Sequence, residues 1–450
     1  MTSASAKSSH NLPAPLWWFC VACIAVTLFS WIFSSAYYHQ TLTENASLWS
    51  HDPSDAFTDF TQYRSLYDSA FHTRAFYFSD GDSFAYPAPA AVLYDGLYHM
   101  GPHQLSIYLG SILAAALAAA ALFFRALRRT GIATAQAALF VTCVTLTSWP
   151  LLFLFERANI EFILWLITAL GVAALLHNRP MLAAALFGVA ASLKLYPIVL
   201  LALLFSPRYW RAFLIGVASF GASLLLSFWF VGPTIGMAFR GTINGILGFV
   251  GNYATTAHSE LGYDHSFFAC FKVFASNPPW NHIDFTASTH LYVPLALLGA
   301  ALLFFLRVRK LPLINQILFV MICMVALPPV SYDYTLVHLS IPFALFVLAW
   351  VRAELPDAKI PGLRRTLLCF CVLFTPQLFL IHATRSANGF IDLNGALKSG
   401  ALAMLLVLLS RHPMHDSDLL AEPAGGAHLR SLPKSKAWAA HFSTLRSGIL

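Results

Sequence analysis

Charged residues are scarce in this sequence: Asp, Glu, Lys and Arg make up 10% of its 450 residues, whereas 58% are hydrophobic. A soluble multidomain protein needs more charge on its surface, so the composition excludes that class. Repeated apolar runs match the ~20 residues that a helix needs to cross a ~30 Å hydrocarbon core. The sequence therefore predicts a polytopic membrane protein.

Other features are also missing. The seven cysteines lie mostly inside apolar runs, so no disulfide framework is predicted. Cys20 and Cys23 form a C-x-x-C within a predicted span, which we interpret as packing rather than redox chemistry. No Gly-rich loop marks a nucleotide site, and no acidic or histidine set has metal-ligand spacing. We therefore expect no cofactor and no metal. The net charge is +7, but the basic residues are distributed according to the predicted sides of the membrane, so the charge does not indicate nucleic-acid binding.

About ten full transmembrane helices are predicted. Their ranges are 16–38, 104–124, 133–155, 158–176, 212–231, 291–306, 313–330, 335–351, 366–383 and 394–410. The first run is too long for a signal-peptide core and is kept as a span. Basic clusters follow alternate spans, and the positive-inside rule places them, with both termini, in the cytoplasm.

This topology gives a single transmembrane domain over residues 1–410 with two long external loops, 39–101 and 232–289. The last segment, 411–450, contains Pro, Gly, Ser and basic residues. We predict that it is a disordered cytoplasmic tail.

Lys194 does not fit a simple span. It lies in SLKLYPIVLLALLF, and a charge at bilayer depth costs roughly 2.5–3.5 kcal/mol on insertion scales. Such residues usually face a cavity, an ion or an anionic ligand. Pro197 follows and predicts a helix break. Because the flanks at Arg179 and Arg208 both favour the cytoplasm, we predict a broken helical hairpin with Lys194 near its turn, in the outer half of the membrane.

Further polar residues fall on the same predicted external side. The first loop carries Asp59 and Tyr63 at helical spacing in DFTQYRSLYDSAF, followed by Tyr86 in AYPAPA. ERANIE places Arg157 and Asn159 at the outer end of a span. A guanidinium fits a phosphate through its planar fork. A polar turn joining two spans is the ordinary alternative for ERANIE, and a solvated loop carboxylate is the ordinary alternative for Asp59.

Two later motifs add acidic groups. The second loop contains Asp264 and His265, and PPVSYDY places Asp333 just outside the eighth predicted span. Adjacent helical residues point about 100° apart, so Asp264 and His265 are not a metal pair by spacing. Cations for a phosphate and a carboxylate for an acceptor hydroxyl, gathered on one side, suit a membrane enzyme with a lipid-anchored anionic donor.

The order of these motifs resembles the polyprenyl-phosphate-mannose-dependent glycosyltransferases of glycosyltransferase family 87, integral membrane enzymes of the GT-C type. The resemblance runs over residues 16–410, and SLKLYPIVLLALLFSPRYWRA is its most specific part. It implies a GT-C-like all-α fold and transfer of a sugar, typically mannose, from a polyprenyl-phosphate donor, with inversion. The acceptor would be a lipid or glycan on the non-cytoplasmic face of the plasma or inner membrane.

The resemblance also implies roles for residues. Asp59 matches the general base, and Lys194 and Arg157 would bind the donor phosphate. The substrate contacts expected are Tyr63, Tyr86, Asn159, Tyr196, Asp264, His265 and Asp333.

Two positions depart from the family pattern. Arg157-Ala158 stands where the family commonly has Gly-Gln before its Asn. Tyr332 and Tyr334 flank Asp333 where the family often has Trp-x-His. The role of this late motif, Ser331–Asp333, is left open.

The alternatives to an enzyme are a transporter or flippase and a non-catalytic scaffold. A transporter or a flippase for lipid-linked sugars would also place a lysine beside a broken helix, but it predicts two similar halves, and none is visible. A non-catalytic scaffold gives no reason for the insertion cost of Lys194. The acceptor, the sugar and the oligomeric state stay open at this point.

Overall fold

The computed structural model describes residues 11–37, 56–73, 76, 84–256, 261–276, 282–352, 362–376, 382–386, 389–392 and 394–413. The predicted tail at 411–450 lies outside these residues except for its first three positions. Much of the first predicted loop, 39–101, is described from residue 56 onward.

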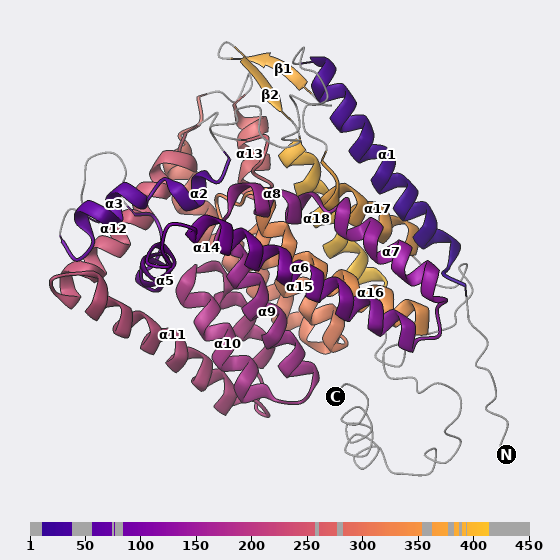
Figure 1. Cartoon of the computed structure of the whole chain (residues 1–450), viewed down its shortest axis with the longest axis horizontal. Helices are drawn as coiled ribbons and strands as arrows, with labels where there is room; N and C mark the ends of the chain where they lie inside the picture. The colour runs from indigo at the N-terminus through magenta and orange to yellow at the C-terminus, as the bar shows by residue number, and fades with distance from the viewer. Residues whose placement is uncertain are drawn as a thin grey trace.

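Helices make up almost all of the regular structure (Figure 1). The α-helices are α1 (Ala14–Tyr37), α2 (Thr58–Thr61), α3 (Arg64–Ala70), α5 (Ala88–Tyr98), α6 (Gln104–Arg129), α7 (Thr134–Leu146), α8 (Trp149–Arg157), α9 (Glu161–Leu176), α10 (Pro180–Leu193), α11 (Trp210–Val231), α12 (Ile235–Tyr253), α13 (Phe267–Ala275), α14 (Phe285–Leu306), α15 (Leu313–Ala326), α16 (Ser340–Arg352), α17 (Leu363–Phe374) and α18 (Asn394–Arg411). The 3-10 helices are η3 (Tyr196–Leu204), η4 (Val308–Lys310) and η5 (Asp333–Leu339).

One small β-hairpin departs from the all-α prediction. β1 (His382–Ser386) pairs antiparallel with β2 (Gly389–Asp392), and Figure 1 shows the hairpin at the top of the view, near α13. The second external segment also contains helices, because α12 and α13 both lie within 232–289. The predominantly helical class is as predicted.

Five helical segments of the described residues are long and apolar enough to cross a membrane: Ala14–Phe33, Gln104–Arg129, Trp210–Val231, Phe285–Lys310 and Asp333–Arg352. A sixth is obtained if α7 and α8, which are bent by 49°, count as one broken span. The predicted count of about ten is not confirmed. Two predicted spans, 158–176 and 313–330, are the shorter apolar helices α9 and α15 instead. α10, which belongs to the predicted broken hairpin, is also a short apolar helix.

Helix breaks explain where predicted spans and helices differ. The predicted span 133–155 is interrupted before α8, whose first turn contains Pro150. The predicted span 366–383 ends early, because α17 stops at Phe374 and Thr375 is extended just before Pro376. A residue that precedes proline is disfavoured in the helical region, so the helix ends there. The hydropathy of these segments did not predict the helix breaks.

The predicted break at Lys194 is present. α10 ends at Leu193, Lys194 is extended with φ −142° and ψ 140°, and η3 then begins with Pro197 in its first turn. The 14 residues of α10 extend about 21 Å, and the nine residues of η3 about 18 Å. Neither reaches the ~30 Å of a hydrocarbon core. The two pieces contact each other as a broken hairpin.

α10 packs between α9 and α11 (Figure 1). Its backbone approaches α11 closely at Gly188, where an added Cβ atom would lie 2.2 Å from the carbonyl oxygen of Gly216. Small residues at such positions let helix backbones meet in membranes. The close contact holds α10 in place and so positions Lys194 at its end.

Gly188→Ala should therefore lower the melting temperature of the purified protein, because the two backbones must separate to admit a methyl group. Overpacking of this kind typically costs about 1–3 kcal/mol. Gly221→Ala is the matched control, since an added Cβ there has no neighbour within 4 Å. Equal melting temperatures for the two variants would contradict the close contact.

Candidate active site

Four segments that are distant in sequence meet at one buried polar cluster. They are α2, the junction between α8 and α9, the break between α10 and η3, and η5. We call Asp59, Arg157, Asn159, Glu161 and Lys194 the Asp59 cluster. Three of the five come from the ERANIE motif.

Local backbone geometry brings the ERANIE side chains together. α8 ends at Arg157, and Ala158 then adopts the left-handed conformation with φ 49° and ψ 41°. A non-glycine residue rarely takes this conformation, and strain of this kind often marks functional sites. α9 begins only at Glu161. Because the helix is interrupted, Arg157, Asn159 and Glu161 reach a common set of partners.

Asp59 is buried in the short helix α2, and both of its carboxylate oxygens are bonded. Arg157 Nη2 donates to Oδ1 at 2.6 Å, and Asn159 Nδ2 donates to Oδ2 at 2.7 Å. The Tyr94 hydroxyl also donates to the Asp59 backbone carbonyl at 2.9 Å. The side chain is therefore held in one orientation from several sides.

Asn159 is the hub of the cluster and is fully buried. Its Oδ1 accepts from Lys194 Nζ at 3.0 Å and from the Glu161 backbone N–H at 2.9 Å. Its Nδ2 faces Asp59 and lies 3.5 Å from the Tyr86 hydroxyl. One amide side chain thus links the carboxylate of Asp59 with the ammonium of Lys194.

Glu161 is the innermost charge of the cluster. Lys194 Nζ donates to Oε2 at 2.7 Å, and His338 Nε2 lies 2.6 Å from Oε1. The Tyr196 hydroxyl also donates to Oε1. The side chain of Glu161 is 0% exposed and that of Lys194 8%, whereas that of Arg157 is 24% exposed. Arg157 is consequently the most exposed of these three charged side chains.

Aromatic rings surround the ammonium group. Lys194 Nζ lies 5.2 Å from the ring centroid of Tyr86 and 5.2 Å from that of Tyr334. Tyr63 packs edge-to-face on Tyr86 with centroids 6.0 Å apart. Burial raises the pKa of the Tyr63 phenol, and the nearby Asp59 carboxylate raises it further. Tyr63 is therefore a neutral hydrogen-bond donor at physiological pH, and the predicted contacts Tyr63, Tyr86 and Tyr196 all adjoin the cluster.

The other three predicted contacts, Asp264, His265 and Asp333, lie in or beside a second polar group. We call Asp333, Lys398, His265 and Trp149 the Asp333 cluster. Asp333 accepts from Trp149 Nε1 at 2.6 Å, pairs with Lys398 and lies 3.2 Å from His265 Nδ1. All four side chains are essentially inaccessible to solvent.

Asp264 anchors the backbone beside the Asp333 cluster. Its Oδ1 accepts from the backbone N–H groups of Ser266 and Ser331, at 2.9 and 3.0 Å. Asp264 and Tyr332 also form an isolated antiparallel bridge. Burial is the largest influence on the Asp264 carboxyl and raises its pKa, against the effect of these two hydrogen bonds.

The two clusters share η5. Asp333 begins this 3-10 helix and His338 lies near its end. Sequence reasoning placed His338 in a span and Glu161 at a membrane boundary without assigning either a role. Lys398, within GALKSGALAMLL, was missed. The insertion-cost argument that singled out Lys194 applies equally to Lys398 and would have found it.

Among the residues that the structure describes, no group of three or more His, Cys, Asp or Glu side chains is placed to hold a metal ion. The polar atoms of the Asp59 cluster are instead shared among oppositely charged protein groups. The cluster contains two carboxylates, Asp59 and Glu161, and two cations, Arg157 and Lys194. Such a set is chemically suited to bind an anion beside a base.

Comparison with known proteins assigns the family. Searches of curated proteins and of solved structures returned no match. A family model described as glycosyltransferase family 87 matches residues 84–331, which is more than half of the chain. The match includes Arg157, Asn159 and Lys194, while Asp59 and His338 lie outside it. The chain belongs to glycosyltransferase family 87 and is a membrane glycosyltransferase.

Proposed function

We propose that this enzyme transfers a sugar, mannose in the first instance, from a polyprenyl-phosphate carrier to a lipid or glycan acceptor. The observation that carries the proposal is the Asp59 cluster, in which one carboxylate and two cations from separate segments are linked through Asn159. The enzyme class supports a sugar transfer, and the two cations suit an anionic phosphate on the donor.

The proposed reaction is a single displacement with inversion. The acceptor oxygen bonds to C1 of the sugar as the bond from C1 to the phosphate oxygen breaks. Asp59 takes the acceptor proton, and the carrier leaves as polyprenyl phosphate with the electron pair. A phosphodiester with one negative charge thereby becomes a monoester with up to two. Cations placed beside the leaving oxygen stabilise that added charge.

Arg157 is proposed to couple donor binding to activation of the base. Both carboxylate oxygens of Asp59 accept short hydrogen bonds, Oδ1 from Arg157 and Oδ2 from Asn159, so both are already engaged by protein donors. The donor phosphate competes with Asp59 for the Arg157 guanidinium. When Arg157 turns to the phosphate, Oδ1 becomes available to the acceptor hydroxyl, while Asn159 still orients Oδ2. Donor binding would then precede acceptor activation.

Lys194 is proposed as the second phosphate ligand. An ammonium group has three N–H donors. Glu161 and Asn159 accept two of them, so one remains for a phosphate oxygen between the Tyr86 and Tyr334 rings. Glu161 holds the cation in position without itself contacting the donor.

The position of the cluster supports a reaction on the non-cytoplasmic face. α9 and α10 pack against each other, and the turn that joins them carries His177, Asn178 and Arg179. The positive-inside rule favours the cytoplasm for this turn and for Arg208. Glu161 and Lys194 lie at the opposite ends of the two helices. We propose a plasma or inner membrane location with both termini cytoplasmic.

For the predicted substrate contacts we propose two different roles. Tyr63, Tyr86, Asn159 and Tyr196 adjoin the Asp59 cluster and remain proposed substrate contacts. Asp264, His265 and Asp333 bond to protein groups in buried surroundings. We propose that these three hold η5 and the loop before α13 in place, and so support the Asp59 cluster without contacting the substrate.

Asp59→Asn should lower transfer of labelled mannose from polyprenyl-phosphate mannose by about 10²–10⁴-fold, because an amide cannot accept the proton. Donor affinity should stay near that of the wild type. The measurement is incorporation of label into the lipid and glycan fractions of membranes that contain the protein. Asp68→Asn, a change in an exposed pair with Arg64, is the matched control and should be silent. Near wild-type transfer by Asp59→Asn would contradict the assignment of Asp59 as the base. If the wild-type protein transferred no label, the proposed donor would be wrong.

Arg157→Gln should weaken donor binding by about 10- to 100-fold, the usual worth of a charge-assisted hydrogen bond of 1.5–3 kcal/mol. The same loss is expected for Lys194→Met combined with Glu161→Gln, a pair that leaves no unpaired buried charge. Donor affinity can be measured by titration of the purified protein. Arg64→Gln is the control. Unchanged affinity in both site variants would refute the phosphate role.

Asp333→Asn should destabilise the protein strongly, by about 3–5 kcal/mol, because it removes the carboxylate that balances the charge of the buried Lys398 ammonium. The double variant Asp333→Asn with Lys398→Met should have a higher melting temperature and a higher donor affinity than Asp333→Asn alone, close to those of the wild type. A double variant that is stable yet does not bind donor would instead indicate that Asp333 contacts the substrate.

A further inference from the structure

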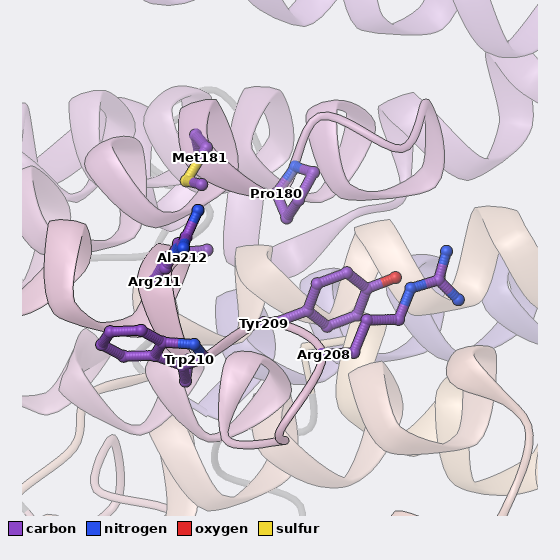
Figure 2. A pocket seen from close by; sticks show the side chains of 7 residues that line it. All are labelled: Pro180, Met181, Arg208, Tyr209, Trp210, Arg211 and Ala212. Carbon is purple, nitrogen blue, oxygen red and sulfur yellow. The ribbon is translucent and has the colours of Figure 1, made fainter.

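A pocket lies far from the Asp59 cluster, between the first turns of α10 and α11. It has a volume of about 300 Å³ and is lined by Pro180, Met181, Arg208, Tyr209, Trp210, Arg211 and Ala212. Figure 2 shows Pro180 and Met181 opposite the segment that carries the two arginines. α10 separates the pocket from Lys194 by 14 residues, or about 21 Å.

The pocket carries the positive charges of two arginines. Arg208 and Arg211 are exposed, and within the described part of the chain neither takes part in an ion pair. Their guanidinium groups lie over the rings of Tyr209 and Trp210, with centroid distances of 5.3 and 5.8 Å. These rings fix the cations near the pocket while leaving their N–H donors available to an anion.

Two helix N-termini add to this charge. α10 has 14 residues and α11 has 22, and neither N-cap residue, Arg179 or Tyr209, provides a side-chain cap. Each N-terminus presents the positive end of a helix dipole and backbone N–H groups, which in α10 begin at Met181 because its first residue, Pro180, has no N–H. The pocket thus combines two guanidinium groups with two helix ends, an arrangement suited to an anion such as a phosphate.

The surroundings point to a lipid phosphate rather than a soluble one. Trp210 is the first residue of a candidate membrane span, where aromatic side chains gather at the interface. Below it, Leu214 and Val217 continue an exposed apolar stripe at helical spacing, and Met181 and Leu182 are exposed on α10. A membrane-spanning protein presents such surface to acyl chains. A phosphate in the pocket would therefore carry its chains directly onto an apolar helix surface.

We propose that this pocket binds the headgroup of an anionic phospholipid. The phosphate accepts from Arg208, Arg211 and the first turns of the two helices, and the acyl chains lie along Trp210, Leu214 and Val217. The bound lipid joins the ends of α10 and α11 and supports their packing. The site is independent of the sugar donor, since it is one helix length from Lys194.

The test is thermal unfolding of the full-length protein in detergent, titrated with phosphatidylglycerol. Ligands that bind only the folded state raise the melting temperature. We expect phosphatidylglycerol to raise it, and neither phosphatidylcholine nor glycerol 3-phosphate to do so at equal concentration. The double variant Arg208→Gln with Arg211→Gln should bind phosphatidylglycerol at least tenfold more weakly. Arg365→Gln, an exposed arginine in the first turn of α17 outside the pocket, should behave as the wild type.

Three outcomes would overturn the proposal. An equal response of the double variant and the wild type would exclude the arginines as ligands. An equal response to phosphatidylcholine would exclude recognition of negative charge. An equal response to glycerol 3-phosphate would show a soluble-anion site in place of a lipid site. Salt provides a check that needs no variant: the phosphatidylglycerol effect on the wild type should weaken as sodium chloride rises, and a salt-independent effect would also count against the proposal.

Discussion

The ion pair between Lys194 and Glu161 is the interaction on which the site depends. Removing two charges from water costs several kcal/mol for each ion, so a buried pair is tolerated only when further hydrogen bonds complete it. Here Asn159 and His338 supply them. Each of these bonds joins a different segment, so the electrostatic requirement of one lysine also fixes the relative positions of α9, α10 and η5.

Interrupted helices make this pairing possible. A continuous helix satisfies its own backbone and spreads neighbouring side chains around its axis. At Ala158 and at Lys194 the helices stop within the protein interior, and polar side chains from the ends converge. The same interruptions leave α9 and α10 too short to act as ordinary spans. The polar groups of the Asp59 cluster therefore gather where the helices are short and interrupted.

The second buried pair extends this logic to the C-terminal helix. Lys398 of α18 binds Asp333 at the start of η5, while His338 further along η5 binds Glu161. α18 also contacts the segment before α13 at Gly395, where an added Cβ would lie 2.0 Å from the Asp264 carbonyl oxygen. Through η5, the Asp59 cluster is thus connected to α18, a helix that lies beyond the region matched to the family.

The sequence by itself determined the membrane class, the break at Lys194 and the residues of greatest interest, because hydropathy, proline and misplaced charge are local properties. Family motifs identified the enzyme class and pointed to Asp59, Arg157 and Lys194. Only the tertiary structure decided which charges are paired. Glu161 lies 33 residues from Lys194 and 177 from His338, and Asp333 lies 65 from Lys398. Such partners depend on how separate helices pack, and no local pattern records that packing. For the same reason, the sequence did not show that His265 and Asp333 are bonded within the Asp333 cluster and that Asp264 anchors the backbone beside it.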